Sequence, residues 1–384
     1  MSPAADPSGR PLWDDAPADT HVPLEGAEEA DLCVVGLGGT GLACVREAQR
    51  LGARVVGLDA GVIGGGAAGR NGGFLLAGLA SFHHDAVAQL GREAAAALYR
   101  LTEEELARIA TDPASGARRT GSLRIAESAH EIADCRAQLA ALEADGFAGE
   151  WYEGPEGVGL LLPHDGTFHP LARCRALARA AVAEGARLHE RSAVVTLAPG
   201  LVETAGGRVR ARHVVVAVDG RLELLLPELA GRVRSARLQM LAGAPTTAVH
   251  LPRPVYARWG YDYWQQRPDG AIAIGGGRDL AGAGEWTTVA TPTALVQRHL
   301  EHRLRDTLGV DAPVTHRWAA IVGYTDDGLP VCEQVRPGLW ALGGYSGTGN
   351  VVGALLGRGA ARRILDGDDV IVRAFDAARA GARA

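Results

Sequence analysis

The chain has 384 residues, of which 47% are hydrophobic and 22% are charged, a composition that fits an ordinary globular protein of one large or two smaller domains. Its net charge of −6 gives no electrostatic reason to expect nucleic acid or an acidic membrane surface as a partner. All 39 basic residues are arginine, so neither a Schiff-base lysine nor a lysine general base is available for catalysis.

The cysteines and the apolar stretches argue against a metal-binding, a secreted or a membrane-spanning protein. The five cysteines, at positions 33, 44, 135, 174 and 332, are scattered and form no Cys-x-x-Cys pair. This predicts no metal site and favours reduced thiols in the cytoplasm. The first twenty residues are polar and unlike a signal peptide. Residues 337–357 carry no charge, but seven of these 21 are glycine, so we predict a strand, a loop and a buried helix there and no membrane insertion.

The predicted elements place nucleotide-binding segments at the start, middle and end of the chain, with other material between them. The elements that we expect are, in chain order, an extended arm (1–29), a strand, tight turn, helix and strand (31–59), two helices (84–110 and 128–145), a turn and a helix (166–190), a short buried strand (214–218), β-like runs separated by turns (233–290), a helix (292–308), and a strand, glycine-rich loop and helix (339–365).

The first of these units carries a dinucleotide-binding pattern. Gly36, Gly38 and Gly41 match G-x-G-x-x-G between a strand and a helix, and Asp59 ends the next strand. In this pattern the first glycine permits the turn, the second lets the backbone approach a pyrophosphate, and the third allows close helix packing. Gly39 and Thr40 begin the helix, whose free N–H groups favour phosphate. Asp59 is expected to accept a hydrogen bond from a ribose hydroxyl.

A second glycine-rich loop, "GVIGGGAAGRNGGF" at residues 61–74, follows directly. It is apolar and runs into a buried-looking Phe-Leu-Leu sequence, unlike a polar, serine-rich linker. Bare buried backbone predicts a large flat group lying against it. A flavin meets this requirement, because its ring extends beyond the pyrophosphate, whereas a nicotinamide-dependent dehydrogenase, the alternative, has little use for the loop.

These two stretches resemble the FAD-dependent amine and amino-acid oxidases of the D-amino-acid oxidase superfamily. The resemblance is strongest to the gamma-glutamylputrescine oxidase family, which carries G-x-x-G-R-N-G-G where this chain has residues 66–73. "DGTFHP" (165–170), "TDDGLPVCE" (325–333) and "GGYSGTGN" (343–350) resemble further family motifs, in the same order. The resemblance spans about residues 10–365, and its middle third matches only loosely.

The resemblance implies an α/β fold, α+β overall. A Rossmann-like FAD-binding domain of the glutathione-reductase type carries an inserted antiparallel-sheet substrate domain. The implied division gives an arm (1–29), an FAD-binding domain (30–82, 164–232 and 326–370), a substrate domain (83–163 and 233–325) and a C-terminal tail (371–384). Beyond the first glycine pattern, the expected FAD contacts are Ala60, Gly66, Ala67, Arg70, Asn71, Gly72, Gly73, Phe74, Val194, Ala217, Gly344, Gly347, Thr348, Gly349 and Asn350.

The same comparison predicts noncovalent FAD. One subset of relatives attaches FAD through a histidine where this chain has Gly66, and sarcosine oxidases use a cysteine where it has a run of small and aliphatic residues, 319–322. The backbone N–H groups of Thr348, Gly349 and Asn350 are expected to stabilise negative charge on the reduced flavin.

The substrate side is expected around an aromatic cluster, "YARWGYDYWQQ" at 256–266. Tyr261, Tyr263 and Gln265 are expected on one face of a strand, where they would line the substrate site. The alternative is that this strand and its neighbour serve only to pack the core. Tyr345 is a further candidate. Arg278 either binds a substrate carboxylate or lies at the surface. The oxygen-activating lysine of sarcosine oxidases is replaced by Ala273, which predicts slow reaction with oxygen unless Arg278 or a histidine, His83 or His84, supplies a cation.

The expected activity is oxidation of a C–N bond in a primary or secondary amine or an amino acid. Hydride transfer to flavin N5 gives an imine that is then hydrolysed, and oxygen reoxidises the flavin to give H2O2. One alternative passes electrons to a quinone or a carrier instead. Another is a non-catalytic FAD-binding protein. The expected partner is a small-molecule substrate, and no oligomeric state is predicted.

Overall fold

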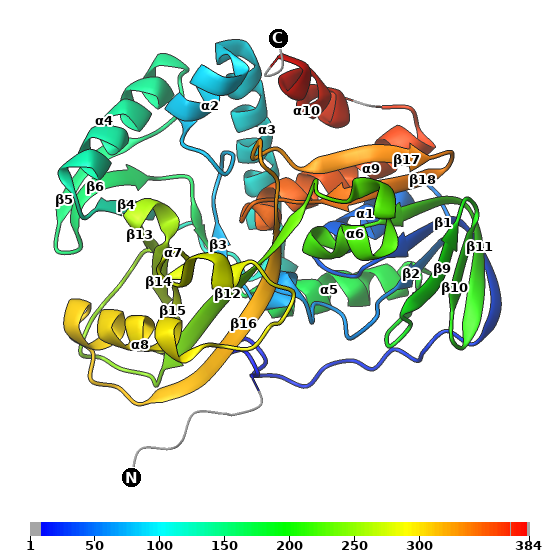
Figure 1. Ribbon diagram of the computed structural model, residues 1–384, viewed down its shortest axis with the longest axis horizontal. Helices are drawn as coiled ribbons and strands as arrows, with labels where there is room; N and C mark the ends of the chain where they lie inside the picture. Colours follow the sequence, from blue (N-terminus) through cyan, green and yellow to red (C-terminus); the bar gives the residue numbers. More distant parts are fainter. Residues whose placement is uncertain (1–8, 369, 382–384) are drawn as a thin grey trace.

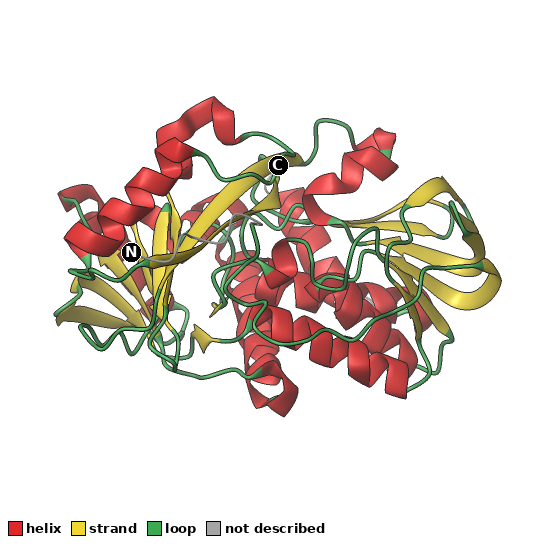
Figure 2. Cartoon of the chain, turned by 90° about the horizontal axis from the view of Figure 1, so that it is seen from below, coloured by secondary structure: helices red, strands yellow, loops and turns green. Residues whose placement is uncertain are grey.

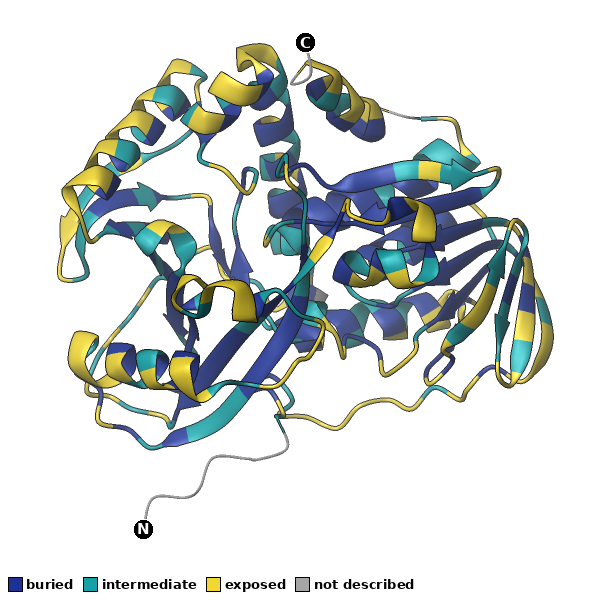
Figure 3. Ribbon diagram, viewed as in Figure 1, coloured by how far each residue is buried: buried dark blue, intermediate teal, exposed yellow. Residues whose placement is uncertain are grey.

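The computed structural model describes residues 9–368 and 370–381 and contains two eight-stranded sheets and one two-stranded sheet (Figure 1). The two large sheets lie toward opposite ends of the molecule, and helices lie between them in the view from below (Figure 2). Most strand residues at the centre of both sheets are buried, whereas exposed residues gather on the outer helices and loops (Figure 3).

The first sheet has the strand order β17-β18-β11-β1-β2-β8. Strands β18, β11, β1, β2 and β8 run parallel, while β17 is antiparallel to β18 and the β9–β10 hairpin extends from β11. Near-continuous apolar runs such as Cys33–Val35 suit a parallel sheet that is covered on both faces. The strands are β1 Gly26–Val35, β2 Val55–Leu58, β8 Arg187–His189, β9 Val194–Ala198, β10 Leu201–Thr204, β11 Gly207–Val216, β17 Val331–Arg336 and β18 Leu339–Gly343.

The second sheet has the order β16-β12-β15-β14-β13-β4-β6-β5 and is antiparallel except for the parallel pair β13–β4. Its strands are β4 Ser122–Ala126, β5 Glu150–Gly154, β6 Gly157–Leu162, β12 Arg234–Gly243, β13 Val255–Ala257, β14 Asp262–Gln266, β15 Ile272–Gly276 and β16 Val314–Tyr324. The two-stranded sheet pairs β3 Phe74–Leu75 with β7 Gly166–Thr167.

Helices cover both sheets. The helix α1 packs against α5 and α9 on one face of the first sheet, and α8 covers the second sheet through Val296 and Leu300. The α-helices are α1 Gly39–Arg50, α2 His83–Leu90, α3 Arg92–Thr111, α4 Ala129–Ala144, α5 Pro170–Ala183, α6 Leu222–Leu225, α7 Arg278–Ala281, α8 Ala294–His302, α9 Ala354–Leu365 and α10 Val370–Gly381. None of the helices in the described residues is long and apolar enough to cross a bilayer.

The predicted fold class is confirmed, because a mainly parallel sheet is interrupted by the segments that build a second, mainly antiparallel sheet. Three boundaries differ from the expectation. The first strand begins at Gly26, inside the predicted arm. The predicted helix at 84–110 is split at Gly91, whose φ of +82° breaks the helical path. The predicted tail forms α10, because its apolar residues Ile371, Val372 and Phe375 are buried against α3 and α9.

Residues 9–25, which we call the arm, form no helix or strand until β1 begins and instead run across the surface of both sheets' domains. The arm departs from this surface course where Leu12, Trp13 and Leu24 are buried. Trp13 is 2% exposed and belongs to the same hydrophobic cluster as Phe74 and Tyr263. Three aspartates of the arm pair with arginines from α5 and the β14 end, in the pairs Asp14–Arg175, Asp15–Arg267 and Asp19–Arg179. The arm therefore fastens α5 to the second sheet.

Candidate functional site

The first glycine loop is shaped by close backbone contacts. Gly36 has a φ of +96°, and a Cβ at this position would lie 2.5 Å from the carbonyl oxygen of Ala217. A Cβ on Gly41 would collide with the Gly36 carbonyl oxygen, and one on Gly38 would lie 3.2 Å from the Ala68 methyl carbon. These contacts bring the end of β1, the end of β11 and the second glycine loop together at one point.

Helix α1 begins at this point without a cap. No side chain bonds its first N–H groups, and no acidic residue occupies its first turn. Such a helix start offers N–H donors and the positive end of the helix dipole to a phosphate group. Gly39 and Thr40 supply this first turn, as expected for a pyrophosphate site.

Arg173 of α5 points at the same helix start and was missed in the sequence. Only 5% of it is exposed, and its Nη1 lies 3.7 Å from where a Cβ of Gly39 would stand. Burial lowers the pKa of Arg173, and Glu105 acts on it only at a distance because that carboxylate is bonded to Arg108 and Arg358. No carboxylate of the described residues pairs with the Arg173 guanidinium, which leaves a cation suited to a pyrophosphate.

Asp59 lies where a ribose is expected. Its two carboxylate oxygens accept hydrogen bonds from the backbone N–H groups of Leu37 and Gly61, each at 2.8 Å. Burial raises the pKa of Asp59. The segment that follows β8 lies beside Asp59, because Ser192 N–H donates a hydrogen bond to the Asp59 carbonyl at 2.7 Å. Val194 follows two residues later at the start of β9, and the exposed Ala60 lies next to Asp59 in the chain.

The second glycine loop is held by an amide pair. Asn71 Nδ2 donates to Asn350 Oδ1 at 3.0 Å, and Asn350 Nδ2 donates back to Asn71 Oδ1 at 3.1 Å. Asn350 Nδ2 also donates to the Phe74 carbonyl, and Gly73 N–H donates to Asn71 Oδ1. The opening and closing loops, 279 residues apart in sequence, are thus joined directly.

Arg70, an expected FAD contact, directs its guanidinium to protein backbone. Its Nε donates to the Ala319 carbonyl at 2.9 Å, and its Nη2 donates to the Gly9 carbonyl. Trp318 Nε1 donates to the Arg70 carbonyl at 2.7 Å. The guanidinium is therefore engaged by protein backbone, and it ties the loop to β16 and the arm. Gly66 and Ala67 form the tight turn that precedes it.

The closing loop is anchored by a buried carboxylate. Asp219 accepts hydrogen bonds from the backbone N–H groups of Gly323, Gly344 and Tyr345. Burial raises the pKa of Asp219, and these N–H donors oppose that rise. Glycines at 344 and 347 take φ values of +69° and +94°, which most residues disfavour. The helical path through Gly349 then starts without a side-chain cap, beside Thr348.

Tyr345 does not face the substrate side. Its ring is 5% exposed, belongs to the core formed by α1 and α9, and lies against Gly349 and Gly353. A Cβ on Gly353 would lie 2.5 Å from Thr40 Oγ1 and 3.5 Å from the Tyr345 ring, so the ring points toward the start of α1. Burial raises the pKa of Tyr345 well above its ordinary value. Its expected place at the substrate is therefore corrected, because the loop turns the side chain inward.

A row of directly paired residues crosses the second sheet and faces the glycine loop. From β16 to β4 the row is Trp318, Met240, Gly275, Tyr263, Tyr256 and Arg124. Directly opposed residues share one face of a sheet. The Tyr263 ring fills the space above Gly275 and lies 3.2 Å from where a Cβ of Gly72 would stand. Gln265 donates to the Gly72 carbonyl, and Trp264 packs on the opposite face.

Arg278 is half-buried among three aromatic rings. Its guanidinium carbon lies 5.4 Å from the Tyr261 ring centroid, 5.3 Å from that of Trp286 and 4.7 Å from that of Tyr324. Tyr324 reaches the closing loop, since its hydroxyl lies 3.9 Å from where a Cβ of Gly347 would stand. Tyr261 precedes β14 instead of belonging to it, so it joins the Arg278 group and not the Tyr263 face. Trp286 and Tyr324 had no signal in the sequence.

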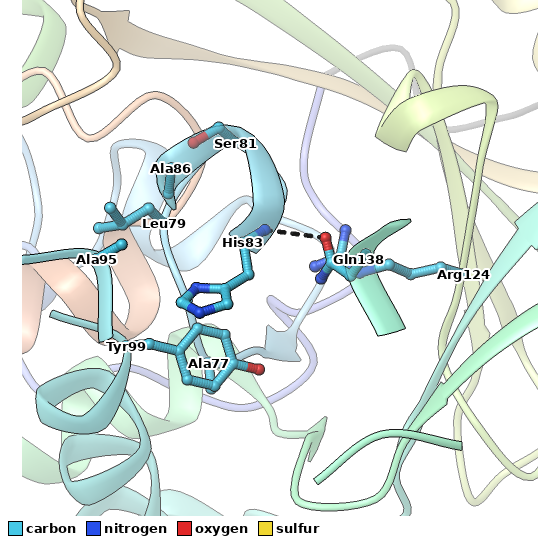
Figure 4. A pocket seen from close by; sticks show the side chains of 10 residues that line it. Ala77, Leu79, Ser81, His83, Ala86, Ala95, Tyr99, Arg124 and Gln138 are labelled. Carbon is cyan, nitrogen blue, oxygen red and sulfur yellow. Dashed lines mark hydrogen bonds between the residues drawn. The ribbon is translucent and has the colours of Figure 1, made fainter. Parts of the chain in front are cut away.

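The histidines proposed as cations lie elsewhere. His83 Nε2 is 2.7 Å from Asp145 Oδ2, and its ring packs edge-on against Tyr99 (Figure 4). The cavity beside it holds about 10 Å³, room for a single water and not for a substrate. His84 is 3.4 Å from Asp85 and stays near the surface of α2. The described residues hold no cluster of three or more His, Cys, Asp or Glu side chains placed to bind a metal.

FAD fits the geometry of the loops. Two glycine loops, an uncapped helix start and a buried arginine without a carboxylate partner converge at one end of the first sheet. Gly66 offers no side chain for covalent attachment, and Cys332 is buried at 4% exposure in the core with a pKa raised to about 12. These residues suit a flavin nucleotide that is held by noncovalent contacts.

Comparison with known proteins agrees with this geometry. The DAO family, described as FAD dependent oxidoreductase, matches residues 31–363. The chain is 28% identical to gamma-glutamylputrescine oxidoreductase of Escherichia coli (strain K12), covering 89% of this chain and 86% of that protein. It is 27% identical to the probable oxidoreductase OrdL of Rhizobium meliloti (strain 1021), covering 87% and 83%.

Two solved structures are similar in fold. Glycine oxidase from Geobacillus kaustophilus gives a TM-score of 0.70 at 22% identity, covering 90% of this chain and 95% of that chain. L-proline dehydrogenase from P. horikoshii gives 0.72 at 18% identity, with the same coverage of both chains. At these identities the likeness concerns the fold. The match over residues 31–363 means that the chain belongs to the DAO family of FAD-dependent oxidoreductases, with FAD as its cofactor.

Proposed function

We propose that this oxidoreductase oxidises the C–N bond of a primary or secondary amine that carries a carboxylate, as an amino acid does. The observation that carries the proposal is Arg278, a half-buried guanidinium beside the closing loop without a carboxylate partner in the described residues. Curated and structural relatives named for glutamylputrescine, glycine and proline support the class of substrate.

The chain's residues would orient the substrate between two fixed features. Arg278 would bind the carboxylate, because a guanidinium held in place by aromatic rings loses little freedom on pairing. Tyr263 and Tyr256 would form an apolar wall that excludes water and favours the neutral amine. FAD, when bound, would supply the hydride acceptor for the carbon next to nitrogen. The imine product would then be hydrolysed in water.

We propose oxygen as the acceptor that reoxidises FAD, with H2O2 as product. A quinone or a carrier protein is the alternative, and Ala273 favours it. Ala273 lies on the same sheet face as Gly275 and is 1% exposed, so no cation stands at this place. A non-catalytic FAD-binding protein is the alternative from another class. We also propose noncovalent FAD and a reducing, cytoplasmic setting, since all five cysteines are buried thiols.

An anaerobic substrate panel tests the proposal. Purified protein is mixed with primary amines, secondary amines and amino acids under nitrogen, and bleaching of the flavin absorbance is recorded. We expect carboxylate-bearing amines to bleach the flavin faster than matched amines that lack the carboxylate, and Arg278→Gln to remove the difference. Bleaching by none of these compounds would favour the non-catalytic alternative, and flavin that stays on the denatured chain would contradict noncovalent binding.

A further inference from the structure

A second guanidinium accompanies Arg278 at the same tryptophan. The Arg234 guanidinium carbon lies 4.0 Å from the Trp286 ring centroid, and that of Arg278 lies 5.3 Å from the same centroid. The two carbons are therefore at most about 9 Å apart, the sum of these two distances. Trp286 is half-buried and meets the Tyr324 ring edge-on at 5.7 Å.

Both cations lack an acidic partner in the described part of the chain. The neighbouring carboxylates are engaged elsewhere, since Asp279 pairs with Arg258 and Glu285 is 1% exposed and pairs with Arg237 at 2.8 Å. Like charges this close repel each other, so their convergence on one ring favours an anion between or beside them. The chain has more acidic than basic residues, so two neighbouring arginines without a carboxylate partner stand out as a candidate anion site.

The couple faces the side of the sheet that carries the substrate wall. Arg234 lies directly opposite Tyr324 in the β12–β16 ladder, so both side chains leave the same face. Met240 and Trp318 lie on this same face, because each is an even number of residues from Arg234 or Tyr324 along its strand. Trp318 also donates a hydrogen bond to the Arg70 carbonyl in the glycine loop. Arg237 and Gln239 point the other way, toward Glu285.

We propose that Arg234, Arg278 and Trp286 form a subsite for a second acidic group, so that the preferred substrate is an amine bearing two carboxylates. The inference rests on the proposed function for the identity of the amine. Arg278 binds the carboxylate nearer the amine, and Arg234, placed over the indole, binds the distal one. Arginine suits this role because its planar fork matches a carboxylate and stacks on an aromatic ring at the same time.

Calorimetric titration of the FAD-loaded enzyme with two unreactive acids tests the subsite without turnover. Glutarate has two carboxylates, and valerate has one on a chain of the same carbon number. We expect glutarate to bind about tenfold tighter or more, the equivalent of about 1.4 kcal/mol. Arg234→Gln should abolish this preference while leaving valerate affinity unchanged, and Arg278→Gln should weaken both acids.

Arg232→Gln is the matched control, because Arg232 is a partly exposed arginine two residues away that pairs with Glu333. It should keep the glutarate preference. Equal affinity for the two acids in the parent enzyme, or a preference that survives Arg234→Gln, would overturn the subsite. A glutarate preference in an enzyme that oxidises no amine would leave the subsite standing and reject the proposed function, so the two failures are distinguishable.

Discussion

At the scale of single residues, Arg173 is the clearest candidate for a side chain that binds the cofactor. Its guanidinium is buried beside the first turn of α1, where a positive charge without a phosphate partner is costly. We expect Arg173→Gln to weaken FAD binding by one or two charge-assisted hydrogen bonds, about 1.5–3 kcal/mol each at most. Equilibrium dialysis of FAD against the two proteins measures this difference.

Arg175→Gln is the control for Arg173, because Arg175 lies on the same helix but pairs with Asp14 of the arm. Its FAD affinity should change by much less. Equal affinities of the parent protein and Arg173→Gln for FAD would show that the guanidinium does not contact the pyrophosphate.

Asp165 gives a prediction on pH at the same scale. This buried carboxyl accepts from Ala77 N–H and Ser122 Oγ, and burial raises its pKa from 3.8 to about 6. The protonated carboxyl contributes fully to the free energy of unfolding below pH 3.8, and this contribution is lost as pH rises through 6. The reason is that Asp165 releases its proton at a lower pH in the unfolded chain than in the folded one. Asp165→Asn should therefore be more stable than the parent at pH 7.5, by about 3 kcal/mol at most, and similar at pH 4.

Urea unfolding at both pH values measures this difference. Asp327→Asn is the control, because its effect on stability should have the opposite sign. Burial raises the Asp327 pKa, but the hydrogen bond and the charge of Arg379 lower it overall. That variant should lose stability at pH 7.5. A parent protein that matches Asp165→Asn at both pH values would place the Asp165 pKa near its ordinary value.

At the scale of elements, the arm is attached to the rest of the molecule through buried side chains, of which Trp13 is the largest. Trp13 Nε1 donates to the Asn71 carbonyl at 2.7 Å, and its ring packs with Phe74 and Tyr263. The arm thus supports the second glycine loop, although it contributes no strand. Its aspartate–arginine pairs are partly exposed, so the buried side chains of Leu12, Trp13 and Leu24 supply most of the attachment.

Trp13→Ala should loosen this loop. We expect a loss of about 3–5 kcal/mol in unfolding free energy, the usual cost of removing a large buried aromatic side chain. The flavin absorbance band should also lose fine structure as the loop gains freedom. Trp259→Ala, which removes an indole that is 44% exposed on the second domain, should change neither quantity by as much. Unchanged melting and spectrum in Trp13→Ala would mean that the arm is dispensable.

Local turn chemistry made the glycine loops predictable, because Gly36 and Gly41 occur at fixed spacing between a strand and a helix. The roles of Arg173 and Trp13 depend on which distant segment packs against them, and nothing in their immediate sequence distinguishes them from the other arginines and tryptophans. Tyr345 was expected at the substrate for the same reason. Its loop is recognisable in the sequence, but packing against α1 sets the direction of the Tyr345 side chain. Arg70 was correctly placed in the loop, but its partners come from β16 and the arm.

At the scale of the whole molecule, the first glycine loop belongs to one large sheet and the proposed substrate wall to the other, and the proposed reaction with oxygen would depend on both. The chain contains no lysine, Ala273 occupies the expected cation position, and His83 is engaged by Asp145. A nearby cation stabilises the superoxide that forms when oxygen takes one electron. We expect reduction by substrate to outpace reoxidation by air by about tenfold or more.

Stopped-flow mixing of the substrate-reduced enzyme with air-saturated buffer measures the second step. Arg278→Gln should slow it further if this guanidinium is the remaining cation. Reoxidation faster than reduction would contradict the prediction and show that another positive group stands beside the ring.

The amide pair between Asn71 and Asn350 has a consequence for how the protein is made. The chain leaves the ribosome from its N-terminus, so the opening loop exists long before its partner. Asn350 follows Asn71 by 279 residues, and β18 and the start of α9 complete both the parallel sheet and the amide pair. The nascent chain therefore has no finished cofactor site until Asn350 has been synthesised. We expect FAD to bind only after this segment has joined the opening loop, so a chain truncated before β18 should not retain FAD.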